Sequence, residues 1–154
     1  LNIHTKHLTS KRKPWYSLEN RLSAPILVGV FNRKGLKFIR NETNVKNLTS
    51  FHCIYPNILL NNKIDLFFAY LLTDVAKNIF NDNKREYGGG LEKFEPNDLN
   101  KSKVINLELI STKIEKKILE NYKKYRISIL NNKEEKVYLE NINSIFVHLL
   151  EIKT

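Results

Sequence analysis

The sequence lacks the features that would assign it to several common protein classes. It has one cysteine, Cys53, so no disulfide bond can form within the chain. A single thiol fits a reducing compartment, and we expect the protein to be cytoplasmic. No apolar run approaches the roughly 20 residues that span a bilayer, so no membrane partner is expected. The chain begins at Leu1, without a methionine or an apolar signal segment, and we expect it to be part of a longer protein.

Groups that carry out catalysis or bind metals are also scarce. The four histidines fall in different predicted elements, and only His4 and His7 resemble a metal-binding pair, within a polar terminus. We therefore expect no metal site. His52 and Cys53 are neighbours on a predicted strand and face opposite ways, so adjacency alone does not make them a catalytic dyad. No glycine-rich turn follows a predicted strand and opens a helix, which excludes the usual phosphate-binding loops.

The chain has a clear excess of positive charge. Lysine and arginine number 26 against 16 acidic residues, for a net charge of +10. The excess is uneven, with +8 in residues 1–77 and +2 in residues 78–154. A concentrated positive field attracts polyanions, of which nucleic acid is the commonest. An ordinary basic protein from a lysine-rich proteome would have the same composition, so charge alone does not decide between these two interpretations.

The first part of the chain has the patterns of a small sheet. Residues 1–13 are polar and basic and predict a lead-in strand or loop. The apolar run at 24–31 predicts a buried strand, and a turn at 32–35 separates it from an alternating strand at 37–40. These two strands predict a hairpin. Residues 49–55 predict a third strand, which ends at a proline.

The pattern then changes to the period of a helix. Apolar residues recur at helical spacing over residues 62–82, which predicts an amphipathic helix with Asn62 as its N-terminal cap. It should end before the three glycines at 88–90, which cannot sustain a helix. Residues 91–107 predict an irregular stretch with a short extended piece at 104–107.

The last third of the chain is predicted to be helical. Apolar residues recur every three or four positions over 110–129 and again over 139–150, with a turn at 131–133 between them. Two such helices with a short connection form an antiparallel hairpin. The fold class is therefore α+β: a small mixed or antiparallel sheet with a central amphipathic helix, then a C-terminal helical hairpin. We expect two domains, at 1–107 and 108–154.

Basic and polar residues gather around the predicted turns. Arginine and asparagine can form two hydrogen bonds to guanine or adenine edges, and lysine and threonine suit phosphate oxygens. Consecutive glycines let a backbone approach another surface closely. For each residue alone an ordinary surface role is the alternative, and for the glycine segment a flexible linker. On this basis we predict DNA contacts for Arg33, Lys34, Arg40, Asn41, Asn47, Thr49, His52, Lys84, Arg85, Tyr87, Gly88, Gly89, Gly90 and Lys93.

A set of short motifs occurs in order between residues 11 and 107. They are Arg12-Lys13-Pro14-Trp15-Tyr16, Ala24-Pro25-Ile26, Phe31-Asn32-Arg33, Phe38-Ile39-Arg40-Asn41, Asn47-Leu48-Thr49, Phe51-His52, Ile54-Tyr55-Pro56, Arg85-Glu86-Tyr87-Gly88-Gly89-Gly90-Leu91 and Lys93-Phe94-Glu95-Pro96-Asn97-Asp98-Leu99. In this order they resemble the C-terminal, target-recognition half of gamma-type N6-adenine DNA methyltransferases of restriction–modification systems, with a TaqI-like specificity domain. Residues 108–154 have no counterpart in this resemblance beyond a helical tail.

The resemblance implies a division of labour within a larger enzyme. An N-terminal Rossmann-like domain binds S-adenosylmethionine and methylates a flipped-out adenine, and the C-terminal domain binds the duplex and reads the site. The family's catalytic motif, Asn/Asp-Pro-Pro-Tyr/Phe, is absent, because the four prolines of this chain are never adjacent. We therefore expect this chain to be non-catalytic and to hold no cofactor of its own. Its expected partners are double-stranded DNA and a methyltransferase catalytic domain, in the same parent chain or in a separate subunit.

A protein–protein interaction module is the alternative function. In this interpretation the helical hairpin packs against a partner and the positive charge is incidental. The apolar stripe at Ile114, Ile118, Tyr122 and Tyr125 supports it, but the same stripe fits packing within the chain. A nuclease would need clustered carboxylates, which the spacing of the acidic residues does not provide.

A salt titration separates the two functions. If the chain binds DNA, its affinity for a duplex should fall steeply as salt rises, because phosphate contacts release counterions. Hydrophobic association with a protein should change little over the same range. A binding isotherm for a duplex that is insensitive to salt would contradict the DNA-binding interpretation.

Overall fold

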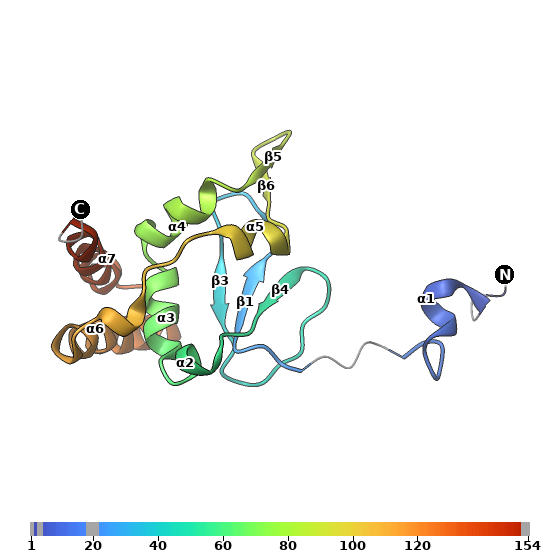
Figure 1. Cartoon of the computed structure of the whole chain (residues 1–154), viewed down its shortest axis with the longest axis horizontal. Coiled ribbons are helices and arrows are strands. Elements are labelled where there is room, and N and C mark those ends of the chain that lie inside the picture. Colours follow the sequence, from blue (N-terminus) through green and yellow to red (C-terminus); the bar gives the residue numbers. More distant parts are fainter. Residues whose placement is uncertain (1, 3–4, 18–21, 152–154) are drawn as a thin grey trace.

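The structure is a computed structural model that describes residues 2, 5–17 and 22–151. Two small sheets lie beside a layer of helices, and the C-terminal helices lie on the far side of that layer (Figure 1). The short helix α1 (His7–Ser10) lies apart from the rest, in a segment for which the sequence predicted a strand or a loop.

The first sheet contains the three strands that the sequence predicted. Its order is β3 (Phe38–Arg40), β1 (Ile26–Gly29) and β4 (Phe51–Ile54), and both pairings are antiparallel. Strand β1 is central and wholly buried, as a continuous apolar run requires. The antiparallel pairing of β1 with β3 confirms the predicted hairpin.

The second sheet contains two strands that the sequence did not predict. Its order is β2 (Phe31–Asn32), β6 (Leu91–Lys93) and β5 (Arg85–Tyr87), again antiparallel. The three glycines form the loop of the β5–β6 hairpin. Gly89 and Gly90 have φ angles of 75° and 70°, a conformation that other residues rarely adopt. The turn therefore requires glycine at 89 and 90.

A sharp bend connects the two sheets between β1 and β2. The buried side chain of Asn32 donates from Nδ2 to the Gly29 carbonyl at 2.9 Å and accepts from the Lys37 backbone N–H at 3.2 Å. A Cβ atom at Gly29 would lie 2.8 Å from Asn32 Oδ1, so only glycine fits there without a shift. The backbone N–H of Phe94 donates to the Val30 carbonyl at 3.1 Å, which holds the end of β6 against the bend.

The prediction of one helix over 62–82 is wrong. The chain forms α2 (Ile58–Asn61), α3 (Ile64–Leu71) and α4 (Asp74–Asn81) instead. Thr73 separates α3 from α4, and its hydroxyl accepts from the Ala76 N–H at 3.2 Å as an N-terminal cap. Both helices still bury apolar residues in the same core, which explains why the apolar period continues across the break.

The predicted cap at Asn62 is wrong as well. Asn62 ends α2, and the cap of that helix is Asn57, whose side chain accepts from the Leu60 N–H at 3.0 Å. The stretch predicted to be irregular contains β6, the short helix α5 (Pro96–Lys101) and the 3-10 turn η2 (Leu107–Leu109).

The C-terminal helical hairpin is confirmed. It consists of α6 (Thr112–Leu130) and α7 (Lys136–Glu151), which pack against each other and against α3. The ring of Tyr70 in α3 meets that of Phe146 in α7 at 5.1 Å between centroids. Ile118 and Ile142 are fully buried in the same core as the first sheet. The α+β class is therefore confirmed, and one hydrophobic core extends across the position between residues 107 and 108.

No helix within the described ranges is both long enough and apolar enough to cross a membrane.

Replacing Phe146 by alanine should test this shared core. Phe146 is fully buried, and removing such a ring typically costs about 3–5 kcal/mol of folding free energy. Urea denaturation followed by far-UV and near-UV circular dichroism should show one earlier transition. Val147→Ala, at the partly exposed next position of α7, is the control and should change stability by about 0.5 kcal/mol or less. Loss of the helical hairpin alone, with the sheet intact, would contradict a shared core.

Candidate nucleic-acid interface

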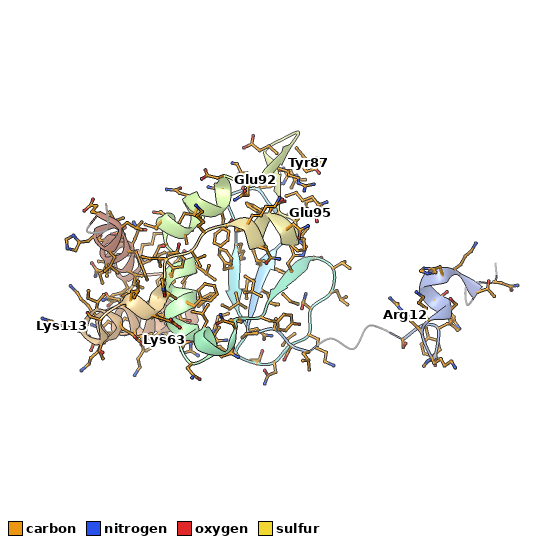
Figure 2. All side chains as sticks on the ribbon, viewed as in Figure 1. Arg12, Lys63, Tyr87, Glu92, Glu95 and Lys113 are labelled. Atoms are coloured by element: carbon orange, nitrogen blue, oxygen red, sulfur yellow. The ribbon has the colours of Figure 1, made fainter. Side chains whose placement is uncertain are left out.

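One face of the second sheet carries aromatic and basic side chains. The register places Phe31, Lys93 and Arg85 opposite one another across the three strands, and Tyr87 opposite Leu91. Because side chains alternate along a strand, all five point to the same side. The side chains of Phe31 and Tyr87 are 57% and 50% exposed. We call these five residues the aromatic–basic face, and Tyr87 lies near the outer end of the hairpin (Figure 2).

On the opposite side of this sheet, one lysine of the hairpin forms ion pairs with two glutamates of the hairpin. Lys84 Nζ lies 2.8 Å from a carboxylate oxygen of Glu86 and 2.8 Å from one of Glu92. Hydrogen bonds to these two carboxylates raise the pKa of Lys84, and the same ammonium lowers the pKa of Glu86. Lys84 was predicted to contact phosphate, but its charge is already balanced within the hairpin.

The two cations of the aromatic–basic face are also paired. Lys93 Nζ lies 2.5 Å from Glu95 Oε1 and 5.6 Å from the centre of the Phe31 ring. Arg85 Nε lies 3.4 Å from Asp98 Oδ2. The hydrogen bond between Lys93 and Glu95 raises the pKa of the lysine and lowers that of the glutamate. Both acids belong to the capping box of α5, so the start of α5 fixes where the cations lie.

Arg33 and Lys34 follow β2 directly and are exposed. If the β2–β6 register is continued by one residue, Arg33 lies beside Leu91, at the end of the sheet where the glycine loop turns. Among the described residues neither cation has a carboxylate within ion-pair distance. Thr49 is exposed near the other end of this pairing, where the Val30 N–H donates to the Ser50 carbonyl. Pairing of β2 with β6 thus brings two distant parts of the predicted site together.

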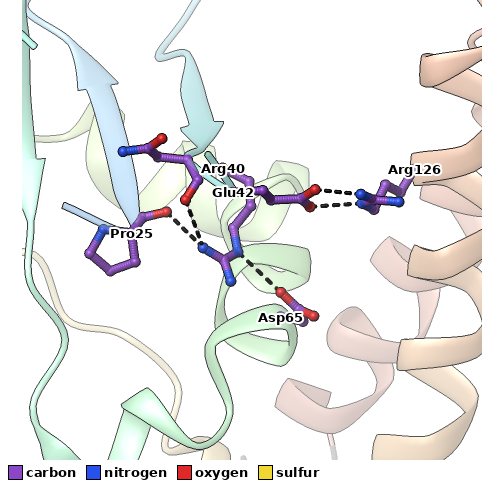
Figure 3. A network of polar contacts seen from close by, with 6 residues as sticks. Pro25, Arg40, Glu42, Asp65 and Arg126 are labelled. Atoms are coloured by element: carbon purple, nitrogen blue, oxygen red, sulfur yellow. Dashed lines mark hydrogen bonds and ion pairs between the residues drawn. The ribbon is translucent and has the colours of Figure 1, made fainter. Parts of the chain in front are cut away.

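Arg40 and Asn41 lie at the opposite end of the first sheet and are used internally. Arg40 donates from Nη1 to the Pro25 carbonyl at 3.0 Å, and its Nε lies 3.1 Å from Asp65 Oδ1 (Figure 3). Asn41 is buried, and its Nδ2 donates to the carbonyls of Ala24 and Val45, both at 2.8 Å. These contacts give both side chains a structural role, so we leave them out of the interface.

A second ion pair in the same region joins the sheet to the helical hairpin. Arg126 of α6 forms two hydrogen bonds with the carboxylate of Glu42, which follows β3 (Figure 3). The hydrogen bond from Arg126 lowers the pKa of Glu42. This region therefore holds α6 against the end of the sheet.

Asn47 and His52 connect backbone segments. Asn47 Nδ2 donates to the Phe51 carbonyl at 2.9 Å, and its Oδ1 accepts from Cys53 Sγ at 3.0 Å. His52 Nε2 lies 2.9 Å from the carbonyl oxygen of Phe94, which ties β4 to the end of β6. These contacts hold the segment before β4 to β4, and β4 to the end of β6.

Phe31 and Leu91 belong to the aromatic–basic face, although the sequence pattern did not predict DNA contacts for them. Phe31 could have been found, because it alternates with Arg33 on either side of the buried Asn32. Of the two histidines that resembled a metal-binding pair, His4 lies outside the described residues and His7 lies in α1. Within the described ranges, no three His, Cys, Asp or Glu side chains gather as metal ligands would.

Replacing Arg40 should affect folding. Arg40→Met leaves the half-buried Pro25 carbonyl and Asp65 without their donor, and such a loss costs about 1–3 kcal/mol. Arg33→Met, at an exposed position, is the control and should change stability by about 0.5 kcal/mol or less. Thermal denaturation measures both effects. Unchanged stability in Arg40→Met together with weaker DNA binding would return Arg40 to the interface.

Comparison with known proteins supports the resemblance. The sequence matches the family model described as "Type II methyltransferase M.Eco57I, C-terminal domain" over residues 1–139. It is 58% identical over 126 residues to Type II methyltransferase M.AccI of Acinetobacter calcoaceticus, covering 80% of this chain and 23% of that protein. It is 31% identical over 102 residues to Type II methyltransferase M.XamI of Xanthomonas campestris pv. amaranthicola, covering 66% of this chain and 19% of that protein. No solved structure matches.

These matches cover more of the chain than the sequence motifs did, but only a small part of each relative. The chain spans less than a quarter of the length of the curated relatives it matches. The family model reaches residue 139, so it includes α6 and the start of α7, for which the sequence motifs had shown no counterpart. The predicted link to the C-terminal region of a restriction–modification methyltransferase is confirmed. The chain belongs to the family of C-terminal domains of Type II methyltransferases typified by M.Eco57I.

Proposed function

We propose that this chain recognises a specific double-stranded DNA sequence for an N6-adenine DNA methyltransferase whose catalytic domain lies outside it. The observation that carries the proposal is the aromatic–basic face on a hairpin that projects beyond the neighbouring helices (Figure 1). The matched relatives are named as Type II methyltransferases, and we extend that activity to the parent protein of this chain.

The hairpin has the shape of a groove-binding element. The major groove of B-DNA is about 12 Å wide and admits a two-stranded β-ribbon. The loop at Gly88–Gly90 is open, because a Cβ atom added at any of the three glycines would meet nothing within 4 Å. The hairpin can therefore enter a groove without first displacing another part of the chain.

The chemistry of the face suits base edges better than phosphates. Arg85 and Lys93 are compensated by Asp98 and Glu95, so this region adds little net attraction for the DNA backbone. Fixed arginines can form two hydrogen bonds to guanine, carboxylates can accept from the cytosine amino group, and aromatic rings can contact the thymine methyl group. We therefore assign readout to the aromatic–basic face together with Arg33.

Methyl transfer belongs to the rest of the parent protein in this proposal. The glycines of this chain close a β-hairpin, so they do not form the strand-to-helix loop of a Rossmann-like cofactor site. S-adenosylmethionine would be held by the catalytic domain. Flipping an adenine out of the duplex costs a few kcal/mol, which the DNA contacts of a recognition domain would offset.

The alternative function, an interaction module built on the helical hairpin, has lost its main support. Ile118 and Tyr122 of the apolar stripe are buried in the chain's own core, and Ile114 packs against that core. Among the described residues of α6 and α7, exposed large apolar residues gather near the turn of the hairpin, at Ile127, Ile129, Leu130 and Val137, and two more lie along α7 at Val147 and Leu150. This smaller patch suits a contact with the catalytic domain of the parent protein.

Selection from a randomised duplex pool tests the proposed readout. We expect enrichment of one short motif that contains adenine. Arg33→Ala and Tyr87→Ala should each weaken binding to the enriched duplex by about 1–3 kcal/mol if the side chain contacts a base, with a smaller effect on a scrambled duplex. Lys101→Ala, exposed on α5 away from the face, is the control. Equal losses on the enriched and scrambled duplexes, or no enrichment at low salt, would sink the assignment.

A further inference from the structure

The positive charge near the aromatic–basic face is largely compensated, but a different surface carries uncompensated charge. Helix α6 has lysines at positions spaced by three, four or seven residues, which places them on one side of an α-helix. We call this set the lysine face. It consists of Lys113, Lys116, Lys117, Lys123 and Lys124.

All five lysines are exposed, and the opposite side of the helix is buried. Ile118 and Tyr122 pack into the core, which fixes the orientation of α6 and keeps the lysine face outward. In the part of the chain that the structure describes, none of the five lies within ion-pair distance of a carboxylate. Glu120 shares their side of the helix, which leaves this face a formal charge of +4.

The lysine face has no apolar component. Among the described residues, large exposed apolar side chains occur before it, at Leu109, and after it, at Ile127, but not between Lys113 and Lys124. Stable protein interfaces have an apolar core with few charges, so a protein partner fits this surface poorly. Burial of Ile118 and Tyr122 within the core also leaves the lysine face without an apolar side chain to insert into a membrane.

We infer that the lysine face binds the phosphate backbone of duplex DNA outside the recognised sequence. This inference rests on the proposed function. From Lys113 to Lys124 the helix rises about 16 Å, and duplex DNA carries one charge per roughly 1.7 Å of its axis, or about nine over that length. Lysine binds phosphate as a mobile point charge without selecting a base. The lysine face supplies backbone contacts that Arg85 and Lys93, which are paired with carboxylates, do not.

The aromatic–basic face and the lysine face lie on different parts of the folded molecule. Tyr87 marks the hairpin and Lys113 the start of α6, and they are widely separated in Figure 2. A duplex that reaches both surfaces must therefore extend beyond the recognised site. Trimming the flanks of a bound duplex should remove the contribution of the lysine face and leave sequence readout in place.

The test compares two double variants with the same change in net charge, on the full 154-residue chain. Lys116→Gln with Lys123→Gln removes two charges from the lysine face, and Lys101→Gln with Lys103→Gln removes two exposed charges elsewhere. Affinity for a random 30-base-pair duplex is measured against salt concentration. Each lost phosphate contact makes the negative slope of log affinity against log salt shallower by about 0.9. We expect the slope to become shallower by about 1.8 for the first variant and by less than about 0.5 for the second.

Further arms make each outcome decisive. Lys116→Arg with Lys123→Arg should keep the original slope, because the charges remain. Glutamine and lysine have similar helix propensities, and circular dichroism checks that α6 persists. Equal slopes for the two glutamine variants would overturn the inference, since only net charge would then matter, and so would an unchanged slope in the first variant.

The random duplex keeps this test separate from the proposed readout. It needs no recognised sequence, so a pool selection that enriches no motif would contradict the readout and leave the slopes interpretable. Conversely, if selection enriches one motif but Lys116→Gln with Lys123→Gln keeps the original salt slope, only the inference about the lysine face is overturned.

Discussion

The burial of helix α3 from Leu66 to its end is the constraint on which the rest of the structure depends. Every residue from Leu66 to Leu71 is buried, and a helix that is apolar all round must be covered on all sides. The first sheet packs on one side of α3, and α6 and α7 pack on the other. Ion pairs at the rim, Arg40 with Asp65 and Arg126 with Glu42, fix the sheet and the hairpin relative to this helix. The helical hairpin is therefore part of the scaffold that supports the site.

The projecting second sheet is rigid at its base and open at its tip. Asn32 fixes the bend that starts it, the fully buried Phe94 anchors its end, and His52 ties that anchor to β4. Beyond these points the loop at Gly88–Gly90 is open, because a Cβ atom added at any of these glycines would meet nothing within 4 Å. A rigid base with a free tip is the arrangement that a recognition element requires, because side chains can change at the tip without loss of the fold.

Local patterns predicted what local forces determine. The strands β1, β3 and β4 and the helices α6 and α7 follow from apolar period alone. Strands β5 and β6 did not, because each has three residues, most of them charged, and each is stabilised by pairing with a partner distant in sequence or by a glycine turn. The break at Thr73 was hidden because both flanking helices face one core. Arg40 resembled a free arginine, since its partner Asp65 lies 25 residues away in sequence.

Net charge counted along the sequence does not show where the folded surface of this chain is positive. The first half of the sequence holds most of the net charge, which pointed there for DNA contacts. In the folded chain, Arg40, Lys63 and Lys77 of that half are bound to carboxylates, and Lys63 takes its partner, Glu115, from α6. The nearly neutral second half instead exposes a row of lysines on α6 that, among the described residues, have no carboxylate within ion-pair distance. Opposite charges cancel only when folding brings them within a few ångströms, so net charge by segment says little about where a polyanion is attracted. A balanced surface can select by hydrogen-bond geometry while an unbalanced one supplies attraction, and in this chain the fold places the two on different elements.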